Sequence, residues 1–596
     1  MDMNKIILAL FLISTNAYSK SLDCEEFFIL ANFGQKQHLR SPDLNSNFFD
    51  RFANNYLESL NTYGIVLTKK EIEQLSKKIK KNSPKYAKNF KDLKCEVFND
   101  IERDVLEKYK RFDSFQNMKY PKISSLNKIK INEEDFSKVE GIKKFVKKWT
   151  QNEKLINPSE PSKIVVNRIA EDRNEILLKN FYYTLDPHSG YIPEKESVLF
   201  NSDSTGERSG LGVEYVIDFK GIKVSKIIKD SALEDGPIKK DDYILKVNGK
   251  RITQLNQGDF AKQLSIPEGS EVNLQYLNEK NEIKEYKVKT KKFNSSMLKV
   301  SSKIIEKSGK NFLILKIPSF YYDPSKARGA SNDMIEEYRK NKDKKIDAII
   351  LDLRSNPGGA VIEAINMVGY FSGRQIVLYT KDKNRTIPSI SSQKEAEIKE
   401  PLFVMTNKFS ASASEIVSGA LKDLQRGVII GDKTTFGKGT VQEVMNHFQS
   451  EELGIVKFTT SQFYRPNGHS TQIKGVESDI ELPDFFESTK SSESLEKNPL
   501  TYDQIDPILP LDEENKLYIP YLNEKSKERV LKGKKEIESF KNKMTRVDPE
   551  EENSDISDNY PLNETINVAL DYLDVAPLEK VISQTNSEET LKDASK

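Results

Sequence analysis

Two residues that could act together as a catalytic pair lie in the segment KFSASASEIVSGALKDLQRGVIIGDKTTFGKGTVQ, residues 408–442. Ser412 stands in a run of small residues at a predicted helix start, and Lys438 follows 26 residues later between two glycines. A serine hydroxyl is a poor nucleophile unless a base removes its proton, and lysine is a base only when a lowered pKa leaves it neutral. If the two side chains meet, this segment can carry out nucleophilic attack on a carbonyl group.

The residues around this pair favour such chemistry. Apolar residues at positions 416, 417, 420, 421 and 424 lie on one helical face, with Ser412 or Ser414 in the N-cap position. The free N–H groups at a helix start favour a developing oxyanion, and the glycines let the lysine be buried, which lowers its pKa. Each element also has a plainer interpretation. The serines could simply form a flexible loop and a helix cap, and the lysine could lie in an ordinary turn or contact a phosphate. No P-loop pattern surrounds the lysine.

A second glycine-rich element is DLRSNPGG, residues 352–359, which follows the predicted strand AIILDL. Ligands of α/β sheets bind at the carboxyl ends of the strands. The N–H groups of Gly358 and Gly359 could therefore hold an oxyanion together with the N–H of Ala413. An ordinary strand-to-helix turn is the alternative.

Other catalytic chemistries find little support in the sequence. Of the 4 histidines, at positions 38, 188, 447 and 469, none has a partner pattern typical of a catalytic base. Neither HExxH nor a Cys/His cluster occurs, so we expect no metal site and no cofactor. The formal net charge of +2 argues against a dedicated nucleic-acid-binding protein.

At 596 residues the chain is too long for a single hydrophobic core, and its residue patterning changes along its length. We predict a helical N-terminal domain, then a module of short alternating strands, then strands alternating with helices in an α/β arrangement, and finally a charged helical region with a polar tail. The expected boundaries are 1–19 for a signal peptide, then 20–205, 206–291, 292–490 and 491–596.

The N-terminus indicates export. Lys5 precedes the apolar run IILALFLI, and small residues at Ala17 and Ser19 are suitable for cleavage after Ser19. No later apolar run reaches 18 residues, so we expect no transmembrane segment in the mature chain. With Cys24 and Cys95 alone, one disulfide can form in an oxidising compartment, but the spacing leaves open whether it does.

Taken together, DLRSNPGG, FSASASEI and FGKGTVQ resemble the C-terminal processing (tail-specific) serine peptidases, most closely their long periplasmic bacterial form. Further segments are similar to this family: LDPHSGY at 185–191, SGLGVEY at 209–215, ILKIPSFY at 314–321, GHSTQIKGVESDIELP at 468–483 and DNYPLNETINVALDYL at 558–573. The resemblance implies a multidomain α+β protein with a crotonase-like α/β Ser-Lys peptidase core, a PDZ-like module and helical flanking regions. It also implies a periplasmic location.

The resemblance assigns a role to each matching position. Ser412 would be the nucleophile, Lys438 the general base and Gln442 the residue that orients the lysine. Asp423, eleven residues beyond Ser412, matches an aspartate with a supporting role. The oxyanion hole would use N–H groups of Gly358 or Gly359 and of Ala413. In this chain the serine-to-lysine spacing is one residue longer than is usual in the family, with the extra residue between Gly431 and Phe436.

The β-rich module resembles a PDZ domain. Its loop Gly210, Leu211, Gly212 and Val213 would bind a chain-terminal carboxylate through backbone N–H groups, with the two apolar residues lining a pocket for the last side chain.

We therefore expect a serine endopeptidase that recognises proteins by apolar C-termini and degrades or processes unfolded or tail-bearing chains, with an adaptor protein as a further partner. The alternative is a PDZ-containing binding protein with a weak or inactive core, which only the longer spacing supports. A penicillin-binding type of amidase would need a lysine three residues after the serine, where this chain has Glu415.

Overall fold

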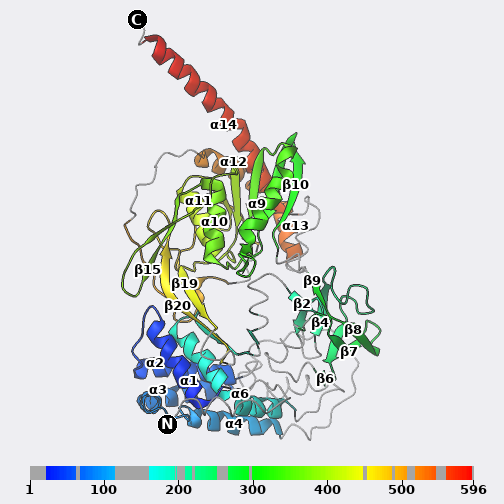
Figure 1. The fold of residues 1–596 in the computed structure, drawn as a ribbon, viewed down its shortest axis with the longest axis vertical. Coiled ribbons are helices and arrows are strands. Elements are labelled where there is room, and N and C mark those ends of the chain that lie inside the picture. Colours follow the sequence, from blue (N-terminus) through cyan, green and yellow to red (C-terminus); the bar gives the residue numbers. More distant parts are fainter. Residues whose placement is uncertain are drawn as a thin grey trace, which may run out of the picture.

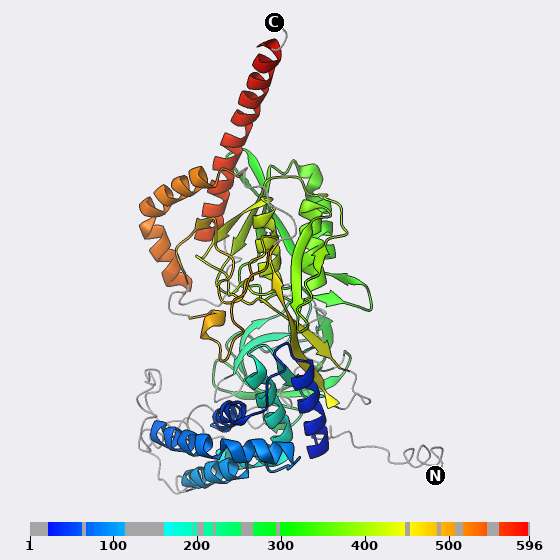
Figure 2. The same ribbon diagram turned by 90° about the vertical axis from the view of Figure 1, so that its left-hand side faces the viewer.

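The computed structural model describes most of the chain (Figures 1 and 2). The described residues are 22–61, 67–113, 160–194, 196–197, 200, 208–217, 222–251, 266, 268–293, 299–446, 453–485, 490–506, 517–544 and 559–593. The predicted signal peptide and its cleavage site, and also His447, lie outside these ranges.

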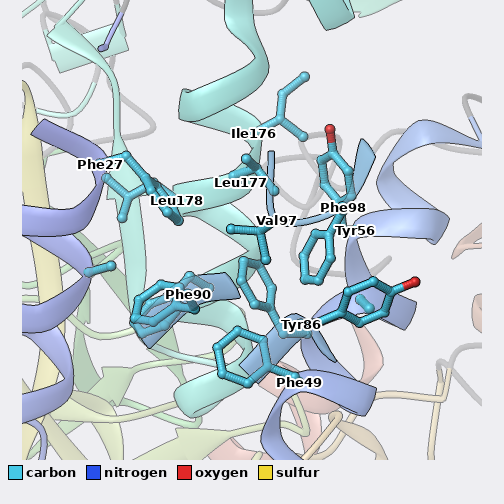
Figure 3. Close-up of a cluster of buried hydrophobic side chains, with 14 of the residues drawn as sticks. Phe27, Phe49, Tyr56, Tyr86, Phe90, Val97, Phe98, Ile176, Leu177 and Leu178 are labelled. Atoms are coloured by element: carbon cyan, nitrogen blue, oxygen red, sulfur yellow. The ribbon is translucent and has the colours of Figure 1, made fainter. Parts of the chain in front are cut away.

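The described part of the N-terminal region contains five helices: α1 (Cys24–Gln37), α2 (Ser46–Leu60), α3 (Lys69–Lys91), α4 (Asn99–Asp113) and α6 (Glu160–Leu185). Capping boxes begin two of them, Asp23 with Glu26 at α1 and Thr68 with Glu71 at α3. Their apolar faces meet in a core that is rich in aromatic rings, including Phe27, Phe49, Tyr56, Tyr86, Phe90 and Phe98 (Figure 3).

A disulfide joins Cys24 at the start of α1 to Cys95 just before α4. The bond closes a loop with a sequence separation of 71 residues. The pairing that the sequence left open is therefore present, as expected of a protein from an oxidising compartment.

The β-rich module lies to one side of the molecule (Figure 1). Its main sheet has the order β3-β4-β5-β7-β8, with β6 paired to β5, and β2 pairs with β9 in a separate ribbon. The strands are β2 (Arg208–Gly210), β3 (Val213–Ile217), β4 (Ile222–Ile227), β5 (Tyr243–Val247), β6 (Lys250–Arg251), β7 (Glu271–Leu277), β8 (Ile283–Lys289) and β9 (Lys291–Phe293). A turn through Asn248 and Gly249, both at positive φ, connects β5 to β6, as the asparagine–glycine pair predicts.

A six-stranded sheet of order β10-β11-β14-β17-β18-β21 forms the α/β core, and it is parallel from β11 onward. Its strands are β10 (Ser301–Lys307), β11 (Lys310–Lys316), β14 (Ala348–Asp352), β17 (Leu402–Thr406), β18 (Gly427–Gly431) and β21 (Ile480–Glu481). Strands β14, β17 and β18 are buried at every position, which explains their nearly continuous apolar sequences.

Helices cover both faces of this sheet. Helices α9 (Ala330–Asn341), α10 (Val361–Ser372) and α11 (Ala413–Asp423) pack on one face. On the other face lie α12 (Ile519–Lys532) and the first part of α14 (Tyr560–Asp593), while α13 (Lys534–Met544) packs beside them. The far part of α14 extends away from the body of the molecule (Figures 1 and 2).

A second sheet of order β1-β20-β15-β16, with β19 paired to β20, connects the core to the N-terminal helices. Its strands are β1 (Gly190–Ile192), β15 (Ile376–Asp382), β16 (Ser389–Ser391), β19 (Thr440–Met445) and β20 (Ile455–Tyr464). Val456 and Phe458 of β20 are buried in the aromatic core of the N-terminal region. The fold is thus the multidomain α+β arrangement that was predicted.

Three short elements complete the core: the hairpin of β12 (Tyr322–Asp323) and β13 (Arg328–Gly329), and the 3-10 turns η5 (Lys342–Lys344) and η7 (Glu493–Leu495). Within the described ranges we find no helix that has both the length and the apolarity needed to cross a membrane.

Candidate active site

Ser412 occupies the N-cap of α11, at the carboxyl end of the parallel strands. The preceding loop is held against the DLRSNPGG turn, because Ala411 donates its N–H to the Asn356 carbonyl at 3.0 Å. Ser412 itself has a φ of 55°, a left-handed conformation that costs free energy in a residue with a side chain. The sharp turn leaves Ser412 partly accessible between buried neighbours, as a nucleophile requires.

Lys438 points its amine at this serine. Its Nζ lies 3.3 Å from Ser412 Oγ. It also donates to the Thr440 carbonyl at 3.0 Å and to Gln442 Oε1 at 2.6 Å. Burial, reinforced by the like charge of Lys457, lowers the pKa of Lys438 to about 8. A minority of the amine is therefore neutral, and able to accept a proton, near neutral pH, and the neutral fraction grows as the pH rises through 8.

Gln442 is fixed on strand β19, four residues after the lysine. Its Nε2 donates to the hydroxyls of Thr440 at 2.8 Å and Thr459 at 3.1 Å. This sets the amide so that its oxygen faces Lys438. The structure therefore brings Ser412, Lys438 and Gln442 together in spite of the extra residue before Phe436.

Glu415 is a site residue that sequence reasoning used only to exclude another enzyme class. Its carboxylate is fully buried and accepts the N–H groups of Ser412 at 2.8 Å, Gly437 at 2.7 Å and Lys438 at 2.9 Å, and the Thr435 hydroxyl at 2.6 Å. Burial raises the pKa of Glu415 to about 7, although these hydrogen bonds oppose the rise. One side chain thus joins the serine loop to the lysine loop. The capping-box spacing from Ser412 to Glu415 was the signal that could have revealed it.

The three candidate oxyanion donors differ in their hydrogen bonds. Gly358 donates its N–H to Asn356 Oδ1 at 2.8 Å. The N–H groups of Gly359 and Ala413 have no acceptor among the described residues. Among the described residues, the N–H groups of Gly359 and Ala413 are therefore unengaged, whereas that of Gly358 is taken.

The backbone at both glycines excludes any side chain. Gly358 has φ +102°, and a Cβ there would lie 2.8 Å from the Cβ of Ser412. Gly359 has φ +144°, and its Cβ would lie 2.3 Å from the Phe320 carbonyl oxygen. The paired glycines are thus required because the turn packs directly against the serine loop.

Asp423 lies at the other end of α11, away from the dyad. It forms an ion pair with Arg465, just after β20, and accepts hydrogen bonds from Asn467. Its contacts therefore fix the C-terminal end of the helix that Ser412 begins.

The candidate carboxylate-binding loop spans the end of β2 and the start of β3. Gly210 pairs with Lys291, and Val213 is half-buried opposite Ile227. Leu211 is inaccessible to solvent and packs in the core of the module. Gly212 has φ +74° and a Cβ there would lie 2.0 Å from the Cβ of Ser231, so only glycine fits this turn.

Comparisons with known proteins match both the α/β core that holds the candidate dyad and the β-rich module. The model of peptidase family S41 matches residues 311–482, and that of the PDZ domain matches residues 197–277. The chain is 26% identical to the tail-specific protease of Haemophilus influenzae, over 83% of this chain and 76% of that protein. It is 31% identical to a probable CtpA-like serine protease of Staphylococcus aureus, over 61% of this chain and 67% of that protein.

Among solved structures, a photosystem II D1 C-terminal processing protease is similar with 20% identity and a TM-score of 0.33, covering 55% of this chain and 88% of that one. The matched regions define a serine peptidase with a PDZ domain. The chain belongs to peptidase family S41 and is a C-terminal processing protease.

Proposed function

We propose that this protein is a tail-specific endopeptidase of the long periplasmic form, and that Ser412 and Lys438 are its catalytic dyad. The observation that carries the proposal is the 3.3 Å separation of Lys438 Nζ and Ser412 Oγ around a lysine with a lowered pKa. A neutral lysine amine has two N–H groups and one lone pair. Because Thr440 and Gln442 accept two N–H bonds, the lone pair is directed at the serine hydroxyl.

The reaction follows from this geometry. Lys438 removes the proton of Ser412 while Oγ attacks the peptide carbonyl, and the oxyanion receives N–H bonds from Gly359 and Ala413. The protonated lysine then gives its proton to the leaving amine, which departs and leaves an acyl-enzyme. Water, activated by the same lysine, hydrolyses the ester and restores Ser412.

We further propose that the PDZ domain selects the substrate. Backbone N–H groups of residues 210–213 would bind the terminal carboxylate, and the peptide would add as a strand to the module. We keep an apolar last residue as part of this proposal, with the half-buried Val213 as the apolar side chain of the loop that remains partly accessible.

The helical regions would restrict access to unfolded or tail-bearing chains and provide a surface for an adaptor protein. We retain the domain boundaries 20–205, 206–291, 292–490 and 491–596 as part of this proposal. The disulfide supports a periplasmic location.

The test compares wild type with Ser412→Ala and Lys438→Ala on an unfolded protein that ends in apolar residues, and on the same protein ending in two aspartates. We expect cleavage of the apolar-tailed substrate by wild type alone, measured by gel and mass spectrometry. Full cleavage of the apolar-tailed substrate by either variant would contradict the assignment of the dyad. Equal cleavage of both tails by wild type would remove the proposal of tail selection.

A further inference from the structure

The dyad is connected to the N-terminal region through buried hydrogen bonds. The hydroxyl of Thr459, which is fully buried on β20, accepts the Nε2–H of Gln442 at 3.1 Å. The backbone of Thr459 is held by the N-terminal region on both sides. Its N–H donates to Ser189 Oγ at 3.1 Å, and its carbonyl accepts the N–H of Leu39 at 2.8 Å. The residue that orients Gln442 is thus positioned by segments outside the peptidase core.

Asp186 organises those segments. It is fully buried and accepts the hydroxyl of Ser189 at 2.5 Å and the N–H groups of His188 at 2.7 Å and Ser189 at 3.1 Å. The backbone N–H of Arg40 donates to Nδ1 of His38, so the ring proton lies on Nε2 and is donated to Asp186 at 2.6 Å. One carboxylate therefore fixes both the turn 186–189 and the loop after α1.

The same turn also supports the segment on the other side of Lys438. The His188 ring contacts the buried Glu493 at 2.6 Å, and Glu493 accepts the Gln472 amide at 2.7 Å. The oxygen of Gln472 in turn accepts the N–H of Gly439, next to Lys438, at 2.8 Å. Two hydrogen-bonded paths thus start at the turn 186–189. One reaches Gly439 through Glu493 and Gln472, and the other reaches Gln442 through Thr459.

We propose that Asp186, Ser189 and Thr459 are positioning residues of the peptidase reaction, and that the N-terminal region must be docked on β20 for the Ser412–Lys438 dyad to work. The physical reason is the single lone pair of a neutral amine, which reaches Ser412 only while the Gln442 amide keeps its orientation. Without Thr459 Oγ1, the Gln442 amide keeps one acceptor, Thr440 Oγ1, and gains freedom to rotate. The proposal rests on the proposed dyad.

Thr459→Val and Ser189→Ala test it in the full-length protein. Valine keeps the β-branched shape of threonine but removes the hydroxyl, and alanine removes the bridge between Asp186 and Thr459. For a fluorogenic peptide with an apolar C-terminus we expect kcat to fall about tenfold with KM unchanged, because misorientation of a catalytic group lowers the rate and not binding. Thr459→Ser, which keeps the hydroxyl, should restore kcat.

Thr184→Val is the matched control, since Thr184 is also a buried threonine of this region and its hydroxyl bonds to the Asn180 carbonyl, off both paths. It should leave kcat unchanged even where it lowers Tm. The inference is wrong if Thr459→Val and Ser189→Ala keep wild-type kcat, or if Thr184→Val lowers kcat by the same factor as they do. Ser412→Ala is assayed alongside. If it is inactive, unchanged kcat in Thr459→Val and Ser189→Ala contradicts only this inference. If Ser412→Ala remains active, the dyad assignment itself is wrong.

Discussion

At the scale of single residues, the environment of Lys438 supports the base role that we propose for it. The amine is surrounded by neutral acceptors, Thr440 O and Gln442 Oε1, and no carboxylate is within hydrogen-bonding distance among the described residues. A lysine held in this way is desolvated without an ion pair, so its charged form is disfavoured. The same residue in an exposed turn would remain protonated and could not act as a base.

A pH dependence follows from this. In the proposed mechanism only the neutral amine accepts the Ser412 proton, so kcat/KM should rise with pH through a midpoint near the Lys438 pKa of about 8. Lys457→Met removes a like charge that lowers this pKa, so the midpoint should move to higher pH. The measurement is kcat/KM for a short peptide from pH 6 to 10, with the exposed Lys303→Met as control. A midpoint that is unchanged or lower in Lys457→Met would contradict the prediction.

At the scale of elements, three parallel strands place the reactive loops at one edge of the sheet. Strand β14 leads into DLRSNPGG and β17 leads into the serine loop, and the two strands pair in parallel, Asp352 opposite Met405. Glu415 then connects the serine loop to the lysine loop that follows β18. Neighbouring strand ends therefore bring together residues that are far apart in sequence.

The close packing of these loops can be tested at Gly358. In Gly358→Ala the new methyl group would lie 2.8 Å from both the Ala411 carbonyl oxygen and the Ser412 Cβ, so the serine must move. We expect kcat to fall about 100-fold, since a displacement of about 1 Å can have that effect. Gly309→Ala, in the β10–β11 hairpin, has a similar positive φ but open space around its Cβ. It should lower Tm slightly and leave kcat unchanged; equal losses of kcat in the two variants would refute the steric explanation.

At the scale of the whole molecule, the peptidase core is not an isolated unit. Strand β20 pairs with β15 and β19 of the core and with β1 of the N-terminal region, and its Val456 and Phe458 are buried among the N-terminal helices. The proposed positioning paths would thereby couple the order of the site to the stability of the helical region. Elements that stabilise that region also support catalysis if the positioning paths act as proposed.

The disulfide provides a test of this coupling. In the chain-entropy model, closing a loop of 71 residues stabilises the folded state by about 4 kcal/mol. The Cys24→Ser/Cys95→Ser double variant should therefore lower the Tm of the N-terminal region in a thermal melt followed by circular dichroism. Peptidase activity should be lost at the same lowered temperature. Activity that outlasts the melting of the N-terminal helices would show that the core functions without them.

The sequence alone determined the features that depend on local chemistry. Glycine pairs, the helix-start pattern at Ser412 and the strand-helix alternation each reflect the conformational preferences of neighbouring residues, so the α/β core and the candidate dyad were predictable. The β-rich module was predictable from its short alternating strands, and its resemblance to a known family implied a PDZ domain. Only the tertiary structure decided which groups surround that dyad. Glu415 accepts the N–H groups of Ser412 and Lys438, and Thr459 holds Gln442. Thr459 is itself held by Ser189, 270 residues earlier in the chain, and Ser189 by Asp186. The N–H of Gly358 is taken by Asn356. Such contacts form when distant segments pack, and no periodicity along the chain records which polar side chains will then face one another.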